Sequence, residues 1–247
     1  MAILRPFIIA LQFLTRLPTP SLRDIQEREF GASMVYYPWV GLLLGIIFAL
    51  TILFATKFLP HSVSAVILLI LWVFVTGGLH LDGLADSADA WVGGYGDREK
   101  TLRIMKDPAC GPIAVAVVVL TLLLKYSALL ELISAGALTA IIAAPIVARA
   151  STLLLFLTTD YVRVAGLGSA IKKYLPQRTA YLHLALSFSL VLYLTWGKGI
   201  TLLLIVLIIY YGLRRLMINR LGGTTGDTAG AMIEIIEAVS LVALTFG

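Results

Sequence analysis

The chain has 247 residues, of which 60% are hydrophobic and only 13% are charged, and its mean hydropathy is +0.96. This composition excludes a soluble globular protein and predicts a multi-pass membrane protein. The net charge of +5 is informative through its distribution between loops, and it does not predict nucleic-acid binding. The single cysteine, Cys110, excludes an intrachain disulfide and a cysteine-rich metal cluster.

Apolar runs predict an all-α fold, a polytopic helical bundle that fills one membrane domain over residues 1–247. Residues 3–15 are expected to form an interfacial or re-entrant helix that ends before Pro18. A membrane span needs about 20 apolar residues. About seven spans follow, at residues 38–58, 62–80, 111–133, 137–157, 181–197, 199–213 and 228–246.

Basic residues are distributed unequally between the predicted loops. Fifteen of the 19 Lys and Arg residues lie on one side of the predicted spans, whereas the opposite side has only Lys57 and Lys198. By the positive-inside rule the basic side is cytoplasmic. We therefore expect the N-terminus and the polar loops inside and the C-terminus outside.

The chain's most concentrated acidic segment follows the second predicted span. Asp82, Asp86 and Asp89 are spaced at i, i+4 and i+7, so one helix face carries all three carboxylates. Like charges at this spacing repel unless a cation neutralises them, and hard oxygen ligands suit Mg²⁺, or Mn²⁺, better than zinc. The sequence predicts a metal site here; the alternative is a solvated acidic helix end.

A short basic helix is predicted directly after this strip. Asp97 is a plausible N-cap, and Lys100, Arg103 and Lys106 recur at intervals of three. Cations beside a metal site suit a pyrophosphate substrate, and the alternative is ordinary binding of lipid head groups. A second basic loop, residues 163–178, has no strong motif. Its sequence is compatible with contact to a nucleotide, with contact to a lipid head group, or with no ligand.

A third polar element, residues 222–237, opens the last predicted span. Backbone N–H groups near Gly226 can hold phosphate, and Asp227, Glu234 and Glu237 need partners inside a membrane. The candidate partners are Arg149, a second cation or the substrate; the alternative is a structural ion pair with Arg149 or Lys125. We expect Asp227 to be catalytic and Gly226, Arg149 and Glu237 to bind substrate.

His80 precedes the acidic strip by two positions. It is a candidate general base or an orienting partner of a metal ligand. The alternative is a structural histidine that is hydrogen-bonded within the protein.

Taken together, these motifs resemble the adenosylcobinamide-GDP ribazoletransferases, or cobalamin synthases. The resemblance runs nearly end to end, and HLDGLAD is its most specific block. The segments that carry it are FLTRLP from Phe13, YYPWVG from Tyr36, GGLHLDGLADSADA from Gly77, MKD from Met105 with Gly111, Arg149-Ala150, TGD from Thr225, Gly230-Ala231 and Glu237.

The resemblance implies an enzyme of the bacterial or archaeal cytoplasmic (inner) membrane. Its substrates would be adenosylcobinamide-GDP and α-ribazole, or α-ribazole 5′-phosphate, and GMP would be released at the last stage of cobalamin assembly. It implies that Asp82 is essential, with Asp86 and Asp89 as companions. A homo-oligomer or an association with other cobalamin-assembly enzymes is also expected.

Two alternatives to this function stay open from the sequence. Asp82-Gly83-Leu84-Ala85 is locally similar to the opening of the CDP-alcohol phosphotransferase motif, which would make the protein a lipid head-group transferase. A corrinoid or cation transporter is the other alternative, although most of the charge lies in loops or near one interface.

Overall fold

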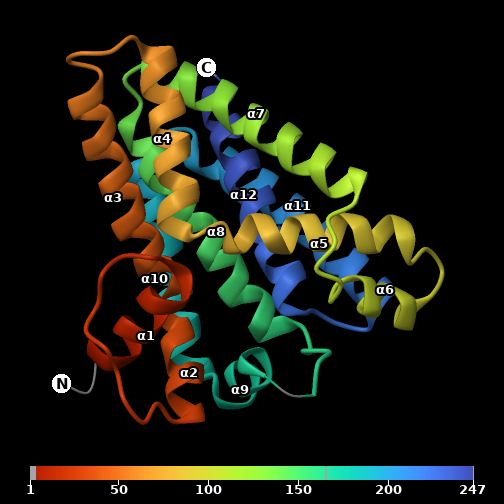
Figure 1. Ribbon diagram of the computed structural model, residues 1–247. Helices are drawn as coiled ribbons and strands as arrows, with labels where there is room; N and C mark the ends of the chain where they lie inside the picture. The colour runs from red at the N-terminus through yellow and green to blue at the C-terminus, as the bar shows by residue number, and fades with distance from the viewer. Residues whose placement is uncertain (1–3, 165, 247) are drawn as a thin grey trace.

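The computed structural model describes residues 4–164 and 166–246, which are almost entirely helical (Figure 1). The elements in chain order are α1 (Leu4–Leu14), α2 (Glu27–Ser33), the short 3₁₀ helix η1 (Met34–Tyr36), α3 (Tyr37–Ala55), α4 (His61–Thr76), α5 (Leu79–Gly93), α6 (Arg98–Ile104), α7 (Pro112–Ser134), α8 (Leu138–Thr158), α9 (Leu167–Tyr174), α10 (Gln177–Leu194), α11 (Gly199–Leu221) and α12 (Gly226–Thr245).

The described residues confirm an all-α bundle of a multi-pass membrane protein, but they do not reproduce seven straight spans. Five helices within them are long and apolar enough to cross a membrane, namely the continuous segment Glu27–Ala55 together with α7, α8, α11 and α12. A sixth span is formed only if α4 and α5 count as one. The remaining predicted span, 181–197, overlaps α10, which is 18 residues long but is not among the described helices apolar enough to cross a membrane.

Two predicted boundaries were wrong. The span predicted at 62–80 ends at Thr76, because Gly77 and Gly78 both adopt positive φ and the chain turns by 86° into α5. Such a left-handed pair suits glycine and ends a helix. The span predicted at 199–213 continues as α11 to Leu221, so Arg214 and Arg220 lie on its last turns and not in a loop.

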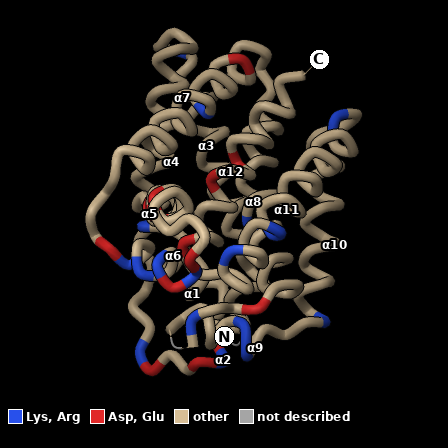
Figure 2. The backbone as a smooth tube through the Cα atoms, turned by 90° about the vertical axis from the view of Figure 1, so that its right-hand side faces the viewer, with Lys and Arg blue, Asp and Glu red and all other residues tan. Residues whose placement is uncertain are grey.

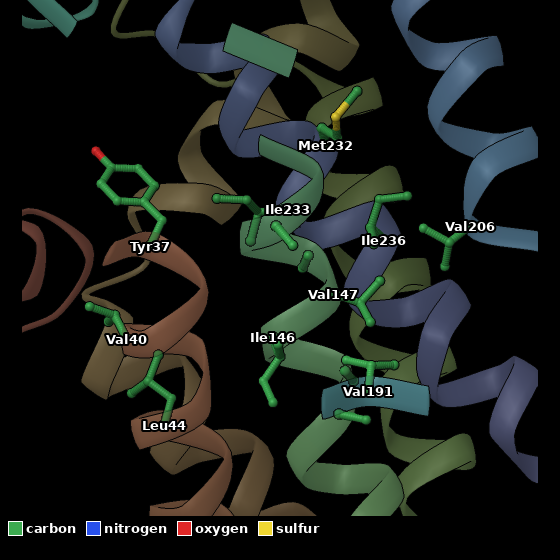
Figure 3. Close-up of a cluster of buried hydrophobic side chains, with 14 of the residues drawn as sticks. Tyr37, Val40, Leu44, Ile146, Val147, Val191, Val206, Met232, Ile233 and Ile236 are labelled. Carbon is green, nitrogen blue, oxygen red and sulfur yellow. The ribbon is translucent and has the colours of Figure 1, made fainter. Parts of the chain in front are cut away.

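Helix α8 is the centre of the bundle. It packs against α3, α10 and α12, and even its charged Arg149 is fully buried. Figure 3 shows this core as side chains from four helices and α8 itself. Ile146 and Val147 of α8 are labelled there among Val40 and Leu44 of α3, Val191 of α10, Val206 of α11 and Met232, Ile233 and Ile236 of α12. Because lipid tails are as apolar as these side chains, close van der Waals packing between the helices is what stabilises this core.

Charge is concentrated toward one end of the bundle. Most Lys, Arg, Asp and Glu positions lie in the part of the molecule that holds α1, α2, α6 and α9 (Figure 2). Helix α1 lies at this end and α12 finishes at the opposite one (Figure 1). Helix α5 runs across the bundle axis between these levels (Figure 1); of its acidic residues, Asp82 is exposed and Asp86 and Asp89 are half-buried.

Candidate functional site

The site forms where α5 crosses α12. A Cβ atom on Gly83 of α5 would lie 2.7 Å from the carbonyl oxygen of Asp227, and one on Gly230 of α12 would lie 3.4 Å from the Cα atom of His80. The two helices therefore approach closely because glycine occupies the contact positions. This crossing brings Asp82 and Asp227, which are 145 positions apart, to the wall of one cavity.

This cavity has a volume of about 300 Å³ and we call it the first cavity. One part of its wall is polar, with Asp82, Asp227, His80, Arg163 and Tyr161. The other part is apolar and aromatic, formed by Phe13, Leu14, Met34, Tyr37, Leu79, Phe156, Leu167, Ile171, Ala229 and Ile233. A cavity with few polar groups in an apolar surround is typical of a site for an organic ligand.

Arg163 is the cation that faces Asp227. Its Nη2 atom donates to Oδ2 of Asp227 at 2.5 Å. Two backbone hydrogen bonds hold the two segments side by side: Val162 donates to Thr224 at 2.9 Å, and Thr224 donates to Asp160 at 2.8 Å. This short pairing places the loop after α8 next to the start of α12.

Tyr161 lies in the same loop and lines the first cavity. Burial raises the pKa of its phenol, although the charge of Arg163 opposes the rise. The hydroxyl is therefore protonated at neutral pH and is available as a donor.

His80 is 3% exposed and lines the first cavity. Neither ring nitrogen has a hydrogen-bond partner among the described residues. The structural alternative from the sequence, a histidine hydrogen-bonded within the protein, is therefore not what the described residues show. A buried imidazole whose two nitrogens have no protein partner is a candidate to bind a ligand or to move a proton.

The acidic strip lies on one face of α5 and opens into a second cavity. This cavity, also about 300 Å³, is lined by Asp82, Asp86 and Asp89 together with the segment from Met105 to Cys110. Asp82 therefore lies on the wall of both cavities. Over residues 4–164 and 166–246 no three acidic, histidine or cysteine side chains are placed closely enough to enclose a metal ion by themselves.

Asp89 has a structural role that the sequence did not predict. Its Oδ2 accepts the Gly111 N–H at 2.5 Å and its Oδ1 accepts the Ala114 N–H at 2.9 Å. The carboxylate thus satisfies two N–H groups at the start of α7, as an N-terminal cap does. The carboxylate oxygens of Asp82 and Asp86, unlike those of Asp89, accept no hydrogen bond from a described backbone N–H group.

The three predicted clamp cations separate in the structure. Asp97 caps α6 as predicted, since its side chain accepts the Lys100 N–H. Lys106 lines the second cavity, whereas Lys100 and Arg103 are exposed and line neither cavity. Lys100 and Arg103 lie on α6, whereas Lys106 follows the end of that helix, in the segment that lines the second cavity.

Arg149 and Glu237, predicted to bind substrate, pair with each other inside the bundle. Nη1 of Arg149 donates to Oε1 of Glu237, and Nζ of Lys125 donates to Glu234 at 2.6 Å and to Glu237 at 2.5 Å. All four side chains are at most 3% exposed, and none lines either cavity. The structural ion pair that the sequence left open is the arrangement observed.

Gly226 lines the first cavity at the start of α12, as the phosphate prediction requires. Thr225 is the N-cap of that helix and accepts the Thr228 N–H at 3.2 Å.

Sequence reasoning missed Arg163 and Tyr161 as site residues. The only signal for Arg163 was its place in a basic loop, which did not distinguish it from Lys172 or Arg178.

Comparison with known proteins identifies the family. The family model described as cobalamin-5-phosphate synthase matches residues 6–245. The chain belongs to the cobalamin-5-phosphate synthase family. A relative from Pseudomonas fluorescens strain Pf0-1, named adenosylcobinamide-GDP ribazoletransferase, is 51% identical over 240 residues, which are 97% of this chain and 98% of the relative. A relative of the same name from Pseudomonas aeruginosa strain PAO1 is 50% identical over 98% of both chains. No solved structure matches the chain.

The cobalamin-5-phosphate synthase motifs converge on the two cavities, although more than 200 residues separate the first from the last. The first cavity takes residues from the motifs at Phe13, Tyr36, Gly77 and Thr225, and the second from those at Gly77 and Met105. The block from Gly77 contributes to both. In this member of the family, the most specific motif therefore forms the wall between the cavities.

Proposed function

We propose that this membrane transferase joins α-ribazole, or its 5′-phosphate, to adenosylcobinamide-GDP, giving adenosylcobalamin or its 5′-phosphate. The observation that carries the proposal is the position of Asp82 on the wall shared by the two cavities. Two substrates must meet at one reacting phosphorus atom, and two cavities that share a carboxylate suit that requirement. The names of the family and of the curated relatives support the same reaction.

The reaction exchanges one phosphorus–oxygen bond for another. A ribose hydroxyl oxygen of the acceptor attacks the phosphorus atom on the cobinamide side of the diphosphate. The anhydride bond breaks, GMP leaves with the electron pair, and the hydroxyl proton needs an acceptor. His80 is our candidate base, because its ring nitrogens have no hydrogen-bond partner among the described residues and it lines the cavity beside Asp82.

We propose a Mg²⁺ or Mn²⁺ ion at Asp82 and Asp86, with Asp227 nearby and Asp89 positioning the start of α7. The donor set fits, because Mg²⁺ in phosphoryl-transfer sites takes one or two carboxylates and completes its shell with water and substrate phosphates. When bound, the ion would neutralise charge on the diphosphate. The amide of Gly226 and the ammonium of Lys106 are placed to bind further phosphate oxygens.

We propose the cytoplasmic (inner) membrane as the location, with both cavities on the cytoplasmic side and α12 ending outside. The concentration of basic residues at the end of the bundle that holds α1, α6 and α9 supports this orientation (Figure 2). A hydrophilic nucleotide-linked donor and the released GMP would then exchange with the cytoplasm.

The reaction is tested with protein purified in detergent. Adenosylcobinamide-GDP, α-ribazole and Mg²⁺ are supplied, and GMP release and the corrinoid product are followed together. We expect one GMP per corrinoid product with the wild type and a near-background rate with Asp82→Asn. CDP-diacylglycerol replaces the donor in a parallel reaction. Release of CMP from it, with no GMP from adenosylcobinamide-GDP, would instead identify a lipid head-group transferase.

A further inference from the structure

The polar wall of the first cavity carries donors that no described protein group uses. His80, 3% exposed, has two ring nitrogens without a hydrogen-bond partner, of which one is a donor in the neutral imidazole, and the Nε atom of Arg163 is buried without a partner. Among the described residues, the only side-chain hydrogen bond of Arg163 is the one from Nη2 to Asp227. The guanidinium thus uses one of its five N–H groups. Unpartnered donors at a cavity wall suit a ligand that carries acceptor oxygens.

The Arg163–Asp227 pair is accessible from the cavity. The side chain of Arg163 is 27% exposed and that of Asp227 is 21% exposed, in contrast to the closed Arg149–Glu237 pair at 0%. A ligand in the cavity can therefore reach both partners. An accessible ion pair contributes little to stability, which makes it a poor candidate for a purely structural brace.

Two helix starts face the same cavity. Gly166, Leu167 and Gly168 at the start of the eight-residue α9 line it, and so does Gly226 at the start of α12. The N–H groups of a first helical turn have no partner within their own helix and favour anions. His80, which lines the same cavity with both ring nitrogens unpartnered, is an independent indication that a polar ligand belongs here.

We infer that Arg163 binds a phosphoryl group of a substrate and that Asp227 holds Arg163 in position until that group replaces it. This inference rests on the proposed function, since it assumes that a phosphorylated substrate enters the first cavity. A phosphoryl group offers two oxygens to the planar guanidinium, which gives two hydrogen bonds where Asp227 accepts one. The exchange also releases the Asp227 carboxylate beside Asp82.

The inference predicts effects of opposite sign for its two residues. Binding of inorganic pyrophosphate is measured by calorimetry on the detergent-solubilised full chain, in EDTA, so that metal binding does not contribute. Arg163→Gln should weaken binding by roughly tenfold or more, the loss expected for removal of charge-assisted hydrogen bonds. Asp227→Asn should strengthen it by about threefold or more, because the competitor for Arg163 is removed and a nearby negative charge disappears.

Asp160→Asn is the matched control. It removes the same charge from the same loop, but its carboxylate is 93% exposed, lies 3.7 Å from Lys172 and lines neither cavity. Pyrophosphate affinity should stay at the wild-type value. Arg163→Lys keeps the charge and loses the planar fork, so intermediate binding is expected; this variant also replaces Arg163→Gln if the latter does not fold.

Two further binding measurements distinguish whether the phosphoryl group that Arg163 binds belongs to the donor or to the acceptor. Affinity for GDP reports on the donor, and the ratio of affinities for α-ribazole 5′-phosphate and α-ribazole reports on the acceptor. If Arg163 binds the donor, Arg163→Lys lowers GDP affinity; if it binds the acceptor, the variant lowers the preference for the 5′-phosphate. Unchanged values in all arms, or weaker pyrophosphate binding in Asp227→Asn, would overturn the inference. These binding measurements need no turnover, so their failure is distinguishable from failure of the proposed reaction.

Discussion

A Cβ atom on Gly83 would lie 2.7 Å from the backbone carbonyl oxygen of Asp227, so these two residues set the separation of α5 and α12. Real Cβ atoms do not approach backbone oxygens this closely, and the site is built at this contact. The glycine of the HLDGLAD block thus has a packing role, and its neighbour Asp82 gains its position from it.

Gly83→Ala should separate the two helices and lower turnover. The cost of overpacking is about 1 to 3 kcal/mol, and a shift of Asp82 relative to Asp227 impairs the alignment that the reaction needs. Thermal unfolding in detergent and GMP release measure the two effects. Gly212→Ala in α11 is the control, because nothing lies within 4 Å of its Cβ position. It should be neutral or slightly stabilising, and equal behaviour of the two variants would contradict the packing role.

Asp82→Asn should mainly lower turnover, whereas Asp89→Asn should mainly lower stability. Asp82 lines both cavities, and removal of an electrostatic group of the reaction typically lowers the rate by about 10² to 10³. Asp89 accepts two N–H groups at the start of α7, so its loss should lower stability by about 1 kcal/mol, with a smaller effect on turnover. Unfolding curves and turnover numbers of both variants decide this. Wild-type turnover of Asp82→Asn at wild-type Mg²⁺ would remove the proposed site.

Metal removal should abolish turnover, and Mg²⁺ or Mn²⁺ should restore it. Asp86→Asn deletes one proposed ligand, so the Mg²⁺ concentration for half-maximal rate should rise by about tenfold, with a smaller change at saturation. GMP release against Mg²⁺ concentration, after EDTA treatment, gives both values. Asp107→Asn, in the loop lining the same cavity, is a control for a general change in charge. An Asp86→Asn curve that coincides with the wild type would place the ion elsewhere.

Glu237→Gln should destabilise the bundle. Glu237 accepts from both Arg149 and Lys125, and all three side chains are buried. Loss of one partner from a buried ion pair leaves an uncompensated charge and typically costs about 3 to 5 kcal/mol. The melting temperature in detergent is the readout. Glu131→Gln, at the exposed end of α7, is the matched control and should melt with the wild type. If Glu237→Gln also melts with the wild type, the cluster has no structural role.

Cys110, the chain's single cysteine, reports the orientation without any mutation. Its side chain is exposed on the loop that lines the second cavity. In intact cells a membrane-permeant maleimide should label it and an impermeant one should not, whereas both should label it in inverted vesicles. A cysteine introduced at Phe246, in Cys110→Ser protein, should show the reverse pattern. Labelling of Cys110 from outside would invert the proposed topology.

The sequence determined what depends on neighbours along the chain. Hydropathy located the apolar helices, the i, i+4, i+7 spacing placed Asp82, Asp86 and Asp89 on one face, and Asp97 was recognisable as a cap. The family motifs also indicated the enzyme class, because they extend over nearly the whole chain. Each of these signals depends on spacings within a few residues or on a motif that can be matched position by position.

Only the tertiary structure decided which distant residues meet. The 86° turn at Gly77–Gly78 redirects α5 across the bundle, and the crossing with α12 then unites Asp82 with Asp227. Arg163 pairs with Asp227, whereas Arg149 and Lys125 pair with the glutamates of α12. From the sequence Arg149 and Lys125 were interchangeable partners for these acids and Arg163 was not named as one, because Coulomb attraction does not depend on chain position. Helix packing selects among them, since it sets which side chains come within a few ångströms and which carboxylates are closed off from the cavity.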